Sequence, residues 1–228
     1  MKRHATPFWV TTLALAACSL IATGCHNASP RSSQVVADSV SGFYGEQGAN
    51  GWSYGYWDYT ADPDKSYDQG TDFQLLRQFG SDPINQLSTR PELGTGQLWT
   101  LQDGLYYTSL WAGGGHPNGA MYLGAHAQVE HWAVRRWVST ADGPVTISGH
   151  AAKVLATNWS GGVQTRIVVD GTTVFSAVID NRGTNYSVEA EVHRGSLVDF
   201  LIGPGLPDAY AVGVTKFTAT IRAAPASP

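Results

Sequence analysis

Apolar and polar residues alternate along most of the second half of the chain, and a period of two predicts β-strands. The clearest example is the segment 185–202, whose first run carries its apolar residues on one face: Tyr186, Val188, Ala190 and Val192. Arg194-Gly195 interrupts the alternation before it resumes toward residue 202. We therefore predict a hairpin of two strands here, with one face buried.

The other patterned segments predict an all-β fold. Residues 166–179 indicate a second hairpin, because Asp170-Gly171 suits the positive φ angles of a type I′ turn. Three further segments alternate as strands: residues 131–139, 143–156 and 216–222. No segment of ordinary helix length has a period of 3.6, and residues 72–80 are expected to supply one short helical turn at most. The pattern predicts a single antiparallel β-sandwich of the jelly-roll type.

The N-terminal segment predicts export and a lipid anchor. Residues 1–24 combine a basic start, a short apolar stretch and small residues, which is the pattern of a secretory signal. Small residues directly before Cys25 resemble a bacterial lipobox, in which the cysteine is lipidated and becomes the new N-terminus; ordinary cleavage without a lipid is the alternative. By resemblance to bacterial sorting rules, His26 after the cysteine favours the outer membrane. We expect an outer-membrane lipoprotein or a secreted protein of the cell envelope.

The pattern also sets domain boundaries. Residues 25–40 are small, polar and without period, so we expect a flexible tether. The β-sandwich domain is expected over residues 41–223, and residues 224–228 are expected to form a disordered tail.

Cysteine content and charge exclude several classes of site and partner. Only Cys18 and Cys25 are present, so a chain processed at Cys25 has no disulfide and no cysteine-based metal site. Of the 14 basic residues, Lys2 and Arg3 belong to the signal, which leaves 12 against 18 acidic residues, a net charge of −6. This balance argues against a nucleic-acid partner, whose phosphates are neutralised by Lys and Arg.

Residues 51–60, GWSYGYWDYT, concentrate aromatic side chains to an unusual degree. In an extended strand Trp52, Tyr54 and Tyr56 share one face, and Trp57 and Tyr59 share the other. One interpretation places the first face in the core and the second under loops. The other makes the Trp52, Tyr54 and Tyr56 face a solvent-exposed platform that stacks against sugar rings.

Three further residues are candidate ligand contacts. His116 lies at the tip of a predicted Gly-rich loop, residues 111–122, where it either contacts a hydroxyl or caps the turn. One arginine of Arg135-Arg136 must lie on the more buried side of its strand. For Arg136 we expect either an ion pair with a carboxylate or recognition of a carboxylated sugar. Trp159 in a Gly-containing loop can present an exposed ring.

Several of these segments together resemble a bacterial extracellular β-sandwich module. The resemblance is carried by residues 47–58, 113–118, 133–149, 161–179 and 195–205. Such modules are appended to polysaccharide-degrading enzymes and resemble carbohydrate-binding modules. The resemblance implies a jelly-roll fold and a polysaccharide or glycan as the partner.

No enzyme signature is present in the sequence: there is no GxSxG, HExxH, P-loop or cysteine nucleophile. We therefore favour a non-catalytic module. The alternatives are a small jelly-roll polysaccharide lyase or glycosidase, with Tyr107, His116 and Arg136 in the catalytic roles, and an envelope adhesion or structural protein. No cofactor is expected; the Asp-rich segment 58–72 is an alternative Ca²⁺ site, although it lacks EF-hand spacing.

Overall fold

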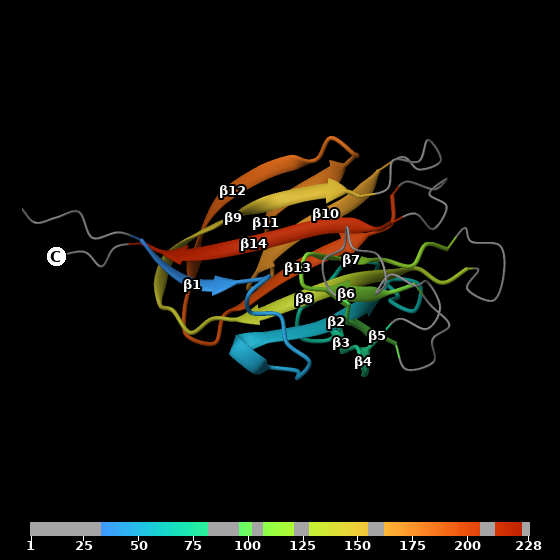
Figure 1. Ribbon diagram of the computed structural model, residues 1–228, viewed down its shortest axis with the longest axis horizontal. Helices are drawn as coiled ribbons and strands as arrows, with labels where there is room; N and C mark the ends of the chain where they lie inside the picture. Colours follow the sequence, from blue (N-terminus) through green and yellow to red (C-terminus); the bar gives the residue numbers. More distant parts are fainter. Residues whose placement is uncertain are drawn as a thin grey trace, which may run out of the picture. The chain divides into compact units, whose positions relative to one another are not determined.

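Two antiparallel β-sheets pack face to face in the computed structural model (Figure 1). The structure describes residues 33–81, 96–101, 107–120, 128–154, 162–205 and 213–224, which belong to one compact unit, Ser32–Pro228. The strands are β1 (Gln34–Asp38), β2 (Trp52–Asp58), β3 (Gln74–Leu75), β4 (Gln78–Gly80), β5 (Leu98–Thr100), β6 (Ser109–Trp111), β7 (Gly114–His116), β8 (His131–Val138), β9 (Gly143–Lys153), β10 (Val163–Val169), β11 (Thr172–Ile179), β12 (Thr184–Val192), β13 (Leu197–Gly203) and β14 (Thr215–Ala223). A 3-10 turn, η1 (Ala49–Gly51), precedes β2.

The strand order confirms the predicted jelly roll. The first sheet has the order β12-β9-β14-β7-β6-β5-β4, with β1 also paired to β14, and the second has the order β11-β10-β13-β8-β2-β3. The nested pairs β1·β14, β8·β13, β9·β12 and β10·β11 form one antiparallel ribbon that is wound into the sandwich. This winding distinguishes a jelly roll from a simple meander.

One predicted hairpin is confirmed and the other is wrong. β10 pairs with β11, and both turn residues, Asp170 (φ 43°) and Gly171 (φ 81°), have the positive φ of a type I′ turn. The segment 185–202 does form two strands, but β12 pairs with β9 in the first sheet, while β13 pairs with β8 and β10 in the second. Alternation reports which face is buried and not which strand is the neighbour.

Two segments expected to lack strands contain them. Residues 34–38, assigned to the tether, form β1 along the end of β14, so the sandwich begins before residue 41. Residues 72–80 contain β3 in the second sheet and β4 in the first instead of a helical turn. The chain therefore crosses between the sheets at Leu76, whose amide donates to the Tyr54 carbonyl at 3.0 Å.

The main core lies between the two sheets. It includes Trp52, Tyr54, Trp137, Ile147 and Phe200, all at most 3% exposed. A second core covers the opposite face of the β2–β8–β13 sheet. Its members are Trp57, Trp132, Val134, Val168 and Leu201, with Tyr59, Tyr67 and Phe73 packed on them from the segment that follows β2.

The segment between β2 and β3 is held by its own acidic side chains. Asp62, Asp64 and Asp68 each accept a hydrogen bond from the backbone amide two residues later. These bonds satisfy backbone amides of the loop that have no partner in a neighbouring strand. The loop therefore forms an ordered cover for the second core, and β2 has a core on each of its two faces.

Candidate functional site

The expected stacking platform is wrong for two of its three residues. Trp52 is 1% exposed and Tyr54 is 0% exposed, because their shared face points into the main core. The Tyr54 ring stacks on Trp99 with centroids 5.8 Å apart, and its hydroxyl accepts from the Tyr44 amide at 3.2 Å. Neither ring is available to a sugar. The interpretation that places one face of β2 in the core and the other under a loop is the one that the structure supports.

Tyr56, the third residue of that face, is only half-buried and lines an open hollow of about 920 Å³. The hollow lies beside the crossing segment that joins β3 to β4. Its lining residues come from strands β2, β3 and β5, from the crossing segment, from the residue after β5 and from the turn before η1: Gln47, Tyr56, Gln74, Leu75, Leu76, Arg77, Trp99 and Leu101. A concave surface with aromatic and aliphatic walls and a few polar groups is the usual form of a small-molecule site.

The polar side chains of this hollow differ in whether they can still form hydrogen bonds with a ligand. The Gln47 amide is committed, because it donates to the carbonyls of Tyr54 and Leu76, both at 2.9 Å, and accepts from the Tyr54 amide. Gln74 accepts the Tyr56 hydroxyl at 2.9 Å and is exposed. Arg77 is also exposed, and no carboxylate among the described residues forms an ion pair with it. The hollow therefore presents an amide and a guanidinium beside an aromatic ring.

A buried histidine packs against Tyr56, and sequence reasoning did not single it out. The rings of Tyr56 and His131 are 5.0 Å apart. His131 Nδ1 lies 3.1 Å from the Thr108 hydroxyl, and Nε2 lies 3.7 Å from Asp58. Thr108 is 0% exposed and His131 is 4% exposed, so this arrangement positions Tyr56 rather than contacting a solute. No sequence signal links Thr108 to His131, because the contact joins β8 to the residue that precedes β6.

His116 is not at a loop tip. It ends β7, which forms a tight hairpin with β6 and pairs with β14, and it is 3% exposed. Its ring packs on Tyr107 with centroids 5.5 Å apart. The three glycines allow this hairpin to lie close to the neighbouring strand, since a Cβ on Gly114 would overlap the carbonyl oxygen of Thr215. The predicted contact between His116 and a ligand hydroxyl is therefore wrong.

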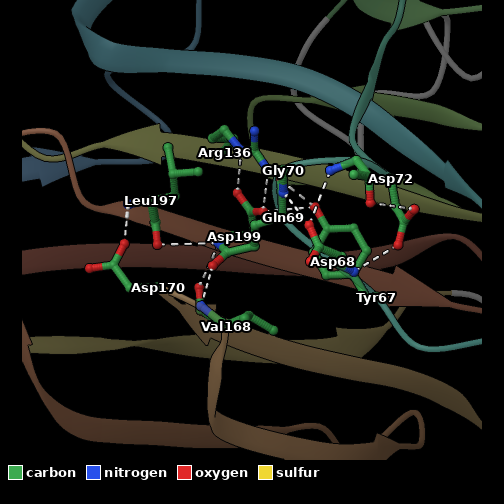
Figure 2. A network of polar contacts seen from close by, with 12 residues as sticks. Tyr67, Asp68, Gln69, Gly70, Asp72, Arg136, Val168, Asp170, Leu197 and Asp199 are labelled. Atoms are coloured by element: carbon green, nitrogen blue, oxygen red, sulfur yellow. Dashed lines mark hydrogen bonds and ion pairs between the residues drawn. The ribbon is translucent and has the colours of Figure 1, made fainter.

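Arg136 forms the ion pair that was one of its two interpretations (Figure 2). Its Nε donates to Asp199 Oδ1 at 2.8 Å and its Nη2 donates to Asp199 Oδ2 at 2.7 Å. Tyr67 donates to the same carboxylate at 2.7 Å, and Arg136 also donates to the Gln69 carbonyl at 2.6 Å. The carboxylate is 0% exposed. Arg136 is thus engaged within the protein, and recognition of a carboxylated sugar by this residue is excluded.

This network shifts the pKa values of its members. Burial and the Asp199 charge raise the pKa of the Tyr67 phenol well above its ordinary value. Burial by itself lowers the pKa of Arg136, but hydrogen bonding and the charge of Asp199 outweigh it and raise that pKa. Both groups keep their usual protonation state. The network fastens the loop after β2 to the sheet (Figure 2).

Arg135, on the opposite face of β8, is the more deeply buried arginine. It is 2% exposed and donates to the carbonyls of Ser39, Trp111 and Gly114. Within the described part of the chain, its Nε has no hydrogen-bond partner. Burial lowers the pKa of Arg135. Through backbone oxygens, the guanidinium joins β6, β7 and the residue that follows β1 to β8.

None of the remaining predicted features adds a described residue to this hollow. Cys25 and Trp159 lie outside the described residues. Among the residues that the structure describes, no group of three or more His, Cys, Asp or Glu side chains is placed to hold a metal ion, and the Asp-rich segment uses its carboxylates in turns. Over the same residues, no helix is long and apolar enough to cross a bilayer.

Comparisons with known proteins identify no family for this chain. No protein-family model and no curated protein matches it. One similar solved structure is a β-glucosidase from Kluyveromyces marxianus, at 8% identity and a TM-score of 0.32. The match covers 84% of this chain and 18% of the enzyme, so the chain corresponds to less than a fifth of that protein. A likeness of this size indicates neither activity nor ligand.

Proposed function

We propose that this protein is an envelope lipoprotein whose jelly-roll domain binds carbohydrate without cleaving it, in the hollow beside Tyr56. The observation that carries the proposal is the composition of that hollow. The half-buried Tyr56 ring and the exposed Leu75 side chain offer apolar surface to the C–H face of a sugar. Gln74 and Arg77 stand beside them as hydrogen-bonding groups for hydroxyls.

Polar groups in the hollow explain why sugar is favoured over a purely apolar ligand. Leu75 is 47% exposed, which is a large value for leucine, so the rim is apolar and open to solvent. A wholly apolar ligand that covered Arg77 would remove water from its guanidinium without offering a hydrogen bond in return, at a cost of at least about 1–3 kcal/mol. A sugar ring satisfies both requirements, since it has apolar faces and hydroxyls at its edge.

Replacing the ring at the centre of the hollow tests the proposal. We expect Tyr56→Ala to weaken glycan binding by roughly ten- to a hundredfold, because an aromatic contact of about 1.5–3 kcal/mol is lost. A glycan array identifies the ligand, and isothermal titration calorimetry measures the change. Tyr56→Phe retains the ring and removes the hydroxyl that donates to Gln74, so it should lose less affinity.

Tyr59→Ala is the matched control, because Tyr59 packs on Trp57 at the second core and does not line the hollow. It should leave affinity unchanged, and thermal unfolding of each variant shows whether the domain is still folded. Silence of the wild type across plant, algal and bacterial glycans would contradict the proposed binding. Release of unsaturated or reducing ends from a polysaccharide would instead establish the lyase or glycosidase alternative.

The lipid anchor is proposed from the sequence and has its own test. We expect Cys25→Ser to abolish incorporation of a labelled fatty acid when the full chain is produced in a bacterial host. Cys18→Ser, which changes the apolar stretch and not the lipobox, should incorporate the label as the wild type does. Multiple acyl chains anchor stably because each buried CH₂ contributes about 0.8 kcal/mol. Equal labelling of the wild type and of Cys25→Ser would show that Cys25 is not the acylated residue.

A further inference from the structure

A second open hollow adjoins the first. It has a volume of about 570 Å³, and its lining residues are Phe43, Tyr44, Gly45, Glu46, Phe79 and Gln97. The Tyr44 side chain is 57% exposed, the most exposed aromatic residue of the described chain. Like the first hollow, it combines aromatic rings with an amide and one charged group.

The two hollows are connected by contacts between their walls. Trp99 of the first hollow packs on Phe79 of the second with centroids 5.2 Å apart. The Trp99 indole donates to the Tyr44 carbonyl at 2.9 Å, which fixes the backbone that carries the exposed ring. Glu46 and Gln47 are consecutive and line the second and first hollow respectively. Both hollows therefore belong to one side of the β4–β5 region.

We propose that the two hollows are consecutive subsites for one polysaccharide chain, which lies across Tyr56 in the first and Tyr44 in the second. This inference rests on the proposed function and adds to it the form of the ligand. A chain that contacts both rings binds more tightly than a single sugar, because the second contact is made within the same complex. The ligand is then an internal stretch of polysaccharide rather than a monosaccharide.

The charged side chains that line the two hollows limit which class of polysaccharide can bind across both. Arg77 lines the first hollow and Glu46 lines the second, so a chain that carries a carboxylate on every sugar gains attraction in one and meets repulsion in the other. An uncharged chain avoids this conflict and uses both side chains as hydrogen-bonding groups. We therefore assign the groove to uncharged polysaccharides.

The test uses series of cello-, xylo- and manno-oligosaccharides of increasing length, with oligogalacturonides of matched length as the charged probes. For the wild-type protein, calorimetry should show affinity rising with length in an uncharged series and then levelling off. Tyr44→Ala should remove the gain in affinity with length, which we expect to be roughly tenfold for one aromatic contact, and should lower affinity for the disaccharide by less than Tyr56→Ala does. Tyr56→Ala should weaken binding at every length.

The outcomes separate this inference from the function on which it rests. If the disaccharide binds in a way that depends on Tyr56, and longer chains bind with no higher affinity, the proposed binding function stands and the second subsite is overturned. Tighter binding of oligogalacturonides than of every uncharged series overturns the assignment to uncharged chains. No binding by any series, together with silence on the glycan array, overturns the proposed function and the inference with it. Val178→Ala, at an exposed position on β11 away from both hollows, serves as the surface control.

Discussion

Asp199→Ala is expected to lower the free energy of unfolding by about 3–5 kcal/mol, because it leaves the Arg136 guanidinium largely buried without its counter-ion. Only 12% of the Arg136 side chain is exposed, so water cannot replace the carboxylate well. The Tyr67 hydroxyl loses its acceptor in the same step. Urea unfolding of the purified domain measures the change, and limited proteolysis should show cleavage in residues 59–73.

A surface ion pair provides the matched control. Asp180 pairs with Arg182 at 2.7 Å, but their side chains are 46% and 90% exposed. Solvent screens such a pair, so Asp180→Ala should leave the urea midpoint close to that of the wild type. The double variant Arg136→Met, Asp199→Leu should recover much of the stability, since an apolar pair of similar size often replaces a buried ion pair. Equal losses in Asp199→Ala and Asp180→Ala would contradict the role given to this network.

Gly149→Ala is expected to destabilise the domain by about 3 kcal/mol, at the upper end of the usual cost of overpacking. Gly149 lies in the middle of β9, between Tyr186 of β12 and Ala219 of β14. A Cβ at this position would overlap the Thr218 carbonyl oxygen and come within 2.7 Å of the Tyr186 hydroxyl. That hydroxyl donates to the Thr218 carbonyl at 2.6 Å, so the substitution disturbs both neighbouring strands.

Ser148→Ala is the control for this prediction, since it lies one residue earlier on the same strand and its side chain is on the outer face. It should change the free energy of unfolding by no more than about 0.5 kcal/mol, as is usual for surface substitutions. Thermal or urea unfolding of the two variants makes the comparison. A Gly149→Ala variant as stable as Ser148→Ala would show that β9 and β14 can separate without cost.

The sequence predicted the positions of the later strands more accurately than it predicted which strands pair with one another. Strand positions in the second half were confirmed because alternation over eight or more residues has no other simple explanation, as in β12. The β10–β11 hairpin was confirmed because Asp170-Gly171 encodes its own turn. β12 and β13 were placed as a hairpin, but Arg194-Gly195 connects strands of different sheets, and a turn dipeptide does not specify that difference.

The candidate site was predicted only in part for a related reason. Tyr56 was identified and does line a hollow, whereas Trp52 and Tyr54 on the same face are sealed in the core. Alternation assigns the three side chains to one face, but the exposure of each depends on where the opposite sheet ends. Trp99 and Arg77 were missed, because nothing in their local sequence marks them as neighbours of Tyr56.

The sequence by itself determined that this chain forms β-strands, which faces of the later strands are apolar, and where one tight turn lies. Those properties follow from the period of the side chains and from the φ preferences of two residues. Only the tertiary structure decided which strands are neighbours, that both faces of β2 are covered, and which aromatic ring stays in contact with solvent. Packing between segments distant in sequence decides these, as at Leu76, where the chain crosses from one sheet to the other and leaves the hollow beside Tyr56 open.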